Sequence, residues 1–139
     1  MLRQTFRTIT LACLFVIVLS PIVISVEASS LVLTGYNCKA QLANIVGGGS
    51  NTLMCRVKNT DPVTTIDGRA DFNYHSLGGV TGFVSSGVVS IPPGQTMVLT
   101  AQLTVPNACD IFIVTGTLVE AGLPGASATF QFRVTVPPC

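Results

Sequence analysis

Strict alternation of apolar and polar side chains is the feature that most restricts what this sequence can fold into. The longest such run spans residues 97–105, and shorter runs cover 53–58, 71–75 and 130–136. A period of two places alternate side chains on opposite faces of a β-strand, whereas a helix would need a period of 3.6. The alternation therefore predicts strands that bury one face and expose the other.

Turn-forming residues divide the chain into about seven short strands. Clusters of Gly, Pro, Asn and Asp separate the alternating runs. Residues 111–114, Ile-Phe-Ile-Val, are apolar in both phases, which predicts a central strand. The expected strands cover 31–43, 51–58, 69–76, 81–91, 96–105, 110–120 and 128–136. This pattern indicates an all-β fold, an immunoglobulin-like β-sandwich of about seven antiparallel strands.

An export signal precedes the predicted sandwich. Arg3 and Arg7 supply positive charge, no charged residue occurs from 8 to 26, and Val26-Glu27-Ala28 fits the small-residue rule for cleavage. We expect a signal helix within a signal peptide at 1–28 and the β-sandwich domain at 29–139, secreted or held at the cell surface. The alternative is an uncleaved anchor, because about 20 apolar residues can span a bilayer. The membrane would then be contacted through this segment alone.

The predicted domain is electrically neutral. The chain has seven basic and six acidic residues, and these become five and five once Arg3, Arg7 and Glu27 are removed. A surface without a basic surplus does not attract nucleic acid, so we expect no nucleic-acid partner. A neutral surface also offers little repulsion between copies. That property is compatible with a protein partner or with self-association.

Four cysteines follow the predicted cleavage site: Cys38, Cys55, Cys109 and Cys139. In a small exported domain this number predicts two disulfides. If strands 110–120 and 128–136 form a hairpin around Pro124, then Cys109 and Cys139 lie opposite each other. We therefore expect a Cys109–Cys139 disulfide.

Cys38 and Cys55 pair by elimination. Symmetry about the glycine turn at 47–49 would place Cys38 near Lys58 instead, so this pairing requires either a bulge or a bridge between the two sheets. Four buried free thiols remain the alternative. A zinc site made of four cysteines normally contains C-x-x-C pairs, and none occurs here.

The sequence offers little for catalysis, and we expect no catalytic residue, no bound metal and no cofactor. His75 is the single histidine and lies in the polar phase of a strand, so any Ser–His or Cys–His mechanism would have to use it. Asp61, Asp67 and Asp71 are close in sequence, as calcium ligands can be, but their spacing does not match a calcium-binding loop. Turn and cap roles are the favoured interpretation of these three carboxylates.

Several motifs resemble the CARDB-type immunoglobulin-like domains of bacterial and archaeal extracellular proteins. They are Met-Cys-Arg-Val-Lys-Asn-Thr-Asp at 54–61, Asp-Phe-Asn-Tyr at 71–74, and Val-Ser-Ile-Pro-Pro-Gly-Gln-Thr at 89–96 followed by Val-Leu-Thr-Ala-Gln-Leu at 98–103. The resemblance covers roughly residues 50–120 and consists of turn and strand positions. It implies a sandwich that is adhesive or structural more often than catalytic, and it carries over no active-site residues.

Two functions fit these observations. The first is a secreted, disulfide-stabilised, non-enzymatic structural or adhesive surface protein, such as a subunit of an extracellular assembly, with residues 29–34 as a strand donated to a neighbour. The alternative is a secreted binding module for a protein or carbohydrate ligand, with contacts from loops 60–68 and 77–82. With no Trp and 6% aromatic residues, the chain is poorly suited to stacking on sugars.

Overall fold

The computed structural model describes residues 32–139, so the predicted signal helix and cleavage site lie outside the described residues. The described part of the chain contains no helix that is long and apolar enough to cross a membrane. Its nine strands are β1 (Leu33–Ala40), β2 (Asn44–Val46), β3 (Ser50–Asn59), β4 (Ile66–Ser76), β5 (Thr81–Ser85), β6 (Val89–Ile91), β7 (Thr96–Thr104), β8 (Asp110–Glu120) and β9 (Leu123–Thr135).

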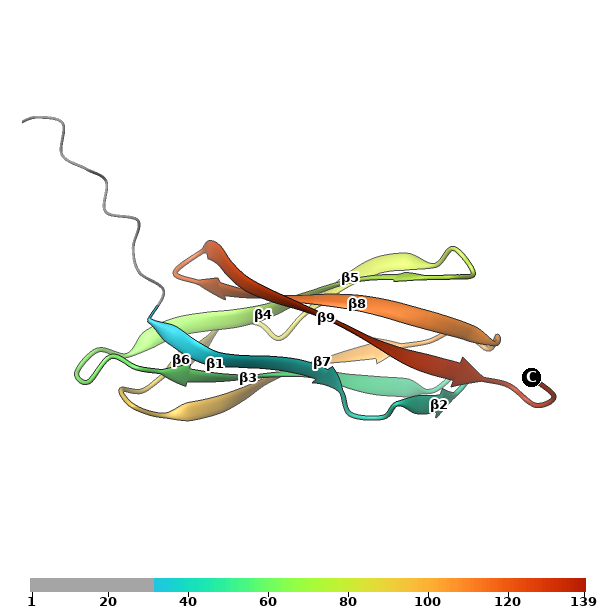
Figure 1. The fold of residues 1–139 in the computed structure, drawn as a ribbon, viewed down its shortest axis with the longest axis horizontal. Coiled ribbons are helices and arrows are strands. Elements are labelled where there is room, and N and C mark those ends of the chain that lie inside the picture. Colours follow the sequence, from blue (N-terminus) through green and yellow to red (C-terminus); the bar gives the residue numbers. More distant parts are fainter. Residues whose placement is uncertain (1–31) are drawn as a thin grey trace, which may run out of the picture. The chain divides into compact units, whose positions relative to one another are not determined.

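The strands form two sheets that face each other (Figure 1). One has three strands in the order β1-β3-β7, and the other has the order β2-β9-β8-β4-β5 with β6 also paired to β4. The all-β sandwich is confirmed, and so is the central position of the strand through 111–114, because β8 lies between β9 and β4.

The expectation of about seven strands, all antiparallel, needs correction. β2 and β6 have three residues each, too short to show an alternating pattern of their own. β2 also runs parallel to β9. After β1 the chain crosses to the other sheet, lies along the end of β9 and then returns to β3. No local pattern in the sequence indicates this crossing.

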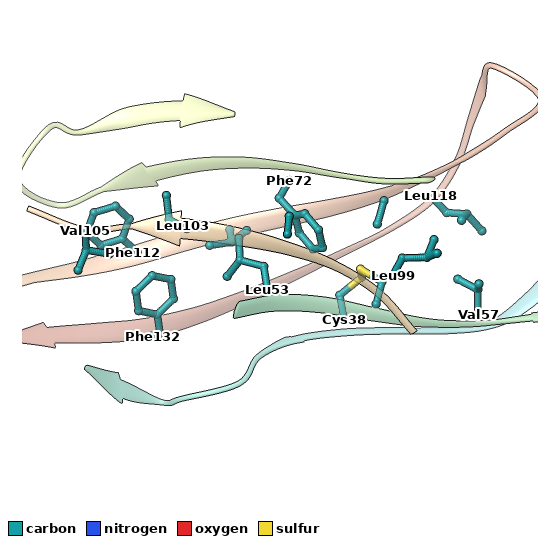
Figure 2. Close-up of a cluster of buried hydrophobic side chains, with 14 of the residues drawn as sticks. Cys38, Leu53, Val57, Phe72, Leu99, Leu103, Val105, Phe112, Leu118 and Phe132 are labelled. Atoms are coloured by element: carbon teal, nitrogen blue, oxygen red, sulfur yellow. A yellow bond between two sulfur atoms is a disulfide. The ribbon is translucent and has the colours of Figure 1, made fainter. Parts of the chain in front are cut away.

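The core consists of the inward-facing side chains of both sheets, and Figure 2 shows them meeting between the layers. The three largest are Phe72, Phe112 and Phe132, each almost fully buried. The rings of Phe112 and Phe132 stack with their centroids 5.3 Å apart. Along β3 and β7 the inward residues alternate with outward ones that are polar except for Met54 and Val98, largely as the sequence pattern predicts. Burial of this continuous apolar layer is the main force that holds the sheets together.

Asn59 is a fully buried polar residue that fixes the turn between β3 and β4. Its side-chain amide donates hydrogen bonds to the carbonyls of Thr64 (2.8 Å) and Ile91 (2.9 Å). Its side-chain oxygen accepts one from the N–H of Asp61 at 2.9 Å. One side chain therefore joins the turn to β6, and all of its bonds are made to backbone groups.

Replacing Asn59 with alanine should lower the free energy of unfolding by about 2–4 kcal/mol, because buried backbone groups lose their partners. Asn73→Ala is the matched control, since Asn73 is an exposed asparagine on β4, and it should cost less than about 0.5 kcal/mol. Chemical denaturation of both variants measures the difference. Equal losses would contradict the role given to Asn59.

The disulfide between Cys38 and Cys55 lies within the three-stranded sheet. The two residues are direct partners in the β1–β3 register, and their Cα atoms are 4.1 Å apart. Neither a bulge nor a bridge between sheets explains the pairing. The only irregularity between these strands falls between Thr34 and Asn37, on the far side of Cys38 from the turn. Instead, the whole crossing segment 41–49 takes the place of the tight glycine turn assumed from the sequence.

The disulfide between Cys109 and Cys139 also forms, but not by the hairpin geometry expected. The β8–β9 turn lies at Ala121-Gly122, where both residues have positive φ (49° and 79°), and not at Pro124. The register places Asp110 opposite Val134, which leaves Cys139 beyond the end of the ladder. A turn closed by a 2.8 Å hydrogen bond from the N–H of Cys139 to the carbonyl of Val136 brings it back. The Cα atoms of the two cysteines are then 6.2 Å apart.

The start of β1 is held inside its own domain. Leu33 is buried in the core and lies opposite Asn59 of β3. The carboxylate of Glu120, 9% exposed, accepts hydrogen bonds from the N–H groups of Val32 (3.1 and 3.2 Å) and Leu33 (3.3 Å). The described part of segment 29–34 therefore already occupies a place in its own sheet. This observation argues against its use as a strand donated to a neighbour.

Glu120→Ala should release this end of β1, because the N–H groups of Val32 and Leu33 lose a charged acceptor. We expect a loss of about 1.5–3 kcal/mol in the free energy of unfolding and faster hydrogen exchange at Leu33. Denaturant titration and amide hydrogen exchange test this. Unchanged protection at Leu33 would contradict the clamp.

Candidate functional site

The outer face of the three-stranded sheet carries most of the domain's positive charge. Inward residues of β1 and β3 alternate with exposed Lys39, Arg56 and Lys58 on the solvent side. These are three of the five basic residues within 32–139. We call this surface the basic face and define it as Asn37, Lys39, Met54, Arg56, Lys58 and Val98.

No negative charge balances these cations on their own sheet. The sequences of β1, β3 and β7 contain no Asp or Glu. The one ion pair within the described residues joins Arg69 to Asp71 at 3.0 Å, on the other sheet. The domain is therefore neutral as a whole but has one positive side. The expectation of an evenly neutral surface has to be corrected in this respect.

Strand register brings the basic face together. Arg56 lies opposite Asn37 on β1 and opposite Val98 on β7. Lys39 lies opposite Met54, one step along the same face. Adjacent strands are about 4.8 Å apart and alternate residues about 6.7 Å apart, so the Lys39 and Arg56 backbones are separated by about 8 Å. Between them runs an open groove of about 290 Å³, lined by Asn37, Lys39, Met54, Arg56 and Val98.

The three aspartates considered for calcium have separate structural partners. Asp61 accepts hydrogen bonds from the N–H groups of Val63 (2.8 Å) and Thr64 (2.7 Å), which lower its pKa. Asp67 accepts from the Ser90 hydroxyl at 2.5 Å. Asp71 pairs with Arg69 and accepts from the Ser85 hydroxyl at 2.8 Å. The described residues contain no group of three possible metal ligands. The turn role expected from the sequence holds for Asp61, whereas Asp67 and Asp71 bond to side chains of their register partners on neighbouring strands.

Asp110 fixes one end of the sandwich. Its carboxylate accepts a hydrogen bond from the Ser76 side chain and others from the N–H groups of Gly78 (2.9 Å) and Ile111 (2.8 Å), and together these lower its pKa. It borders a second hollow of about 370 Å³ beside the Cys109–Cys139 disulfide, which Arg133 also lines. This hollow carries both an acid and a base, so its charge selects no particular ligand.

The remaining positions considered from the sequence do not converge on one site. His75 is exposed and lies opposite Thr81 and Ile113 on the six-stranded sheet, away from the basic face. The loops 60–68 and 77–82 flank the two ends of β4, so they lie at opposite ends of the sandwich (Figure 1). They cannot form one binding site.

Comparisons with known proteins show which solved structures share this fold. No family model and no curated protein matches this chain. Among solved structures it is similar to part of a cycloisomaltooligosaccharide glucanotransferase from Paenibacillus sp. (TM-score 0.57, 20% identity, 70% of this chain and 13% of that chain). It is also similar to the C-terminal domain of Wzt (TM-score 0.55, 10% identity, 76% of this chain and 74% of that one). At these identities the likeness shows the β-sandwich fold alone.

A CARDB domain from Pyrococcus furiosus, solved in complex with di-metal ions, is matched at TM-score 0.48 and 19% identity over 74% of this chain and 87% of that chain. This chain spans only a small part of the glucanotransferase, so the activity of that enzyme is not carried over.

Proposed function

We propose that this chain is exported and acts outside the cytoplasm as a non-enzymatic surface module with an adhesive or structural role. The observation that carries the proposal is the basic face, a positively charged surface. The Cys38–Cys55 disulfide cross-links β1 and β3, two strands of the sheet that presents this face. Disulfides persist in oxidising compartments, which supports a secreted or cell-surface location.

The distribution of carboxylates supports a binding role over a catalytic one. The five carboxylates each accept hydrogen bonds that fix turns, hold strand ends or join neighbouring strands: Asp61, Asp67, Asp71, Asp110 and Glu120. General acid–base catalysis needs a group placed to exchange a proton with a substrate. The basic face instead offers fixed positive charge, which is suited to holding a partner. A binding module for a protein or carbohydrate ligand stays the alternative, and the groove on that face favours it.

The first test is the intact mass of the protein made from the full chain in an exporting host, measured with and without reduction. We expect a mass that begins at Ser29 and increases by two hydrogens for each disulfide on reduction. Light scattering after size-exclusion chromatography then separates the two roles, because an assembly subunit forms large species and a binding module stays monomeric. Retention of the uncleaved chain in the cytoplasm with all five cysteines as free thiols would overturn the proposal.

A further inference from the structure

We propose that the basic face binds an acidic polysaccharide whose carboxylates are held by Lys39, Arg56 and Lys58. This inference rests on the proposed surface function and specifies its partner. The three cations are exposed, lie on neighbouring positions of two paired strands, and face no acidic side chain on their own sheet. Such charges gain most from an external anion, because no internal partner competes for them.

Arg56 is at the centre of this surface. Asn37 lies beside it on one strand and Val98 on the other, while Lys58 is two residues along its own strand. A guanidinium group can donate two parallel hydrogen bonds to one carboxylate. The lysines on either side then provide point charges for neighbouring carboxylates of an extended chain. The groove lies on the Lys39 side of Arg56 and leaves room there for part of the polymer, while Lys58 lies outside it.

The neutral side chains of the face favour a polysaccharide over other polyanions. Thr96, Thr100 and Gln102 of β7 are exposed beside the cations and offer hydrogen bonds to sugar hydroxyls. Tyr36, the one aromatic residue in these three strands, packs against the core. The face therefore has no aromatic platform for nucleic-acid bases. Its apolar residues, Met54 and Val98, lie flat on a sheet and do not form the amphipathic helix that inserts into a membrane.

The test measures binding of the exported protein, produced from the full chain, to polygalacturonate and to its fully methyl-esterified form. The two polymers share a backbone and differ in charge. We expect binding to the acid form only, about tenfold weaker on raising the salt from 50 to 200 mM. Arg56→Gln should weaken binding about tenfold or more. Arg133→Gln, which removes the same charge from the other sheet, should leave binding within about twofold.

Several results would overturn the inference. These are equal binding to both polymers, no binding to either, or equal losses in the two arginine variants, since the last would mean that only net charge matters. Tighter binding to polyglutamate, or to vesicles containing an anionic phospholipid, would replace the polysaccharide with an acidic protein or a membrane. Unchanged melting temperatures establish that both variants are folded. The mass and assembly measurements are independent of this outcome, so failure here leaves the proposed export and surface role standing.

Discussion

Removing the Cys38–Cys55 disulfide with two alanines is expected to cost about 4 kcal/mol or more of the free energy of unfolding. The cross-link spans 17 residues, and the loop-closure model assigns about 3 kcal/mol to a loop of that length. The sulfur atoms are also buried, with Cys55 at 0% exposure. Their loss leaves a void in a close-packed core, which adds about 1–2 kcal/mol.

The opposite sheet cannot easily fill that void. Gly116 of β8 lies so close that a Cβ placed on it would be 2.9 Å from the Cys38 sulfur and 3.2 Å from the Cys55 sulfur. The backbone of β8 thus packs directly on the disulfide. Moving it inward would disturb its pairing with both β4 and β9. The free-energy cost of the void is therefore expected to persist in the variant that lacks Cys38 and Cys55.

The variant lacking Cys109 and Cys139 provides the comparison. That cross-link spans 30 residues, for which the loop term is about 3.6 kcal/mol. Both cysteines are exposed, so their removal leaves no buried void and adds no further loss of stability. Guanidinium denaturation in oxidising buffer should show the larger loss for the Cys38–Cys55 variant, although its loop is shorter. The reverse order would mean that the core around Gly116 relaxes after all.

Phe72→Ala is expected to cost about 3–5 kcal/mol, a large part of the total stability of a domain of this size. The Phe72 ring has 0% exposure. It meets the ring of Phe130 edge-on, with centroids 6.4 Å apart, and lies opposite Gly116 in the β4–β8 register. The glycine leaves space that this ring fills. Truncation removes the ring from the middle of the core.

Phe83→Ala is the matched control for that substitution. Phe83 lies on β5, beside β4, and is 54% exposed, so its truncation should change stability by less than about 1 kcal/mol. Thermal melts and denaturant titrations of both variants measure the contrast. Comparable losses would mean that the outer face of β5 is packed against something. If Phe72→Ala does not fold, Phe72→Leu provides a milder test, expected near 1–2 kcal/mol.

Most of the strands could be predicted from the sequence, because the pleat of a strand is a local property. Alternation located β3, β4, β7 and β9, and the double apolar phase at 111–114 marked β8 as the central strand. The cysteine pairs could be predicted too, since four cysteines allow few combinations. The reasoning behind both pairs was wrong in detail. The β8–β9 register depends on a turn at Ala121-Gly122 that carries no strong signal. Cys38 faces Cys55 because segment 41–49 replaces the tight glycine turn.

The basic face could not be predicted from the charge count. Five positive and five negative residues make the predicted domain at 29–139 neutral, and this count does not say which strands become neighbours. Lys39 and Arg56 are 17 positions apart, and they share a face only because β1 pairs with β3 after the chain has crossed to the other sheet and back. Local periodicity decides which side of a strand each residue faces. Long-range pairing, driven by burial of the common core, decides which of those sides combine into one surface.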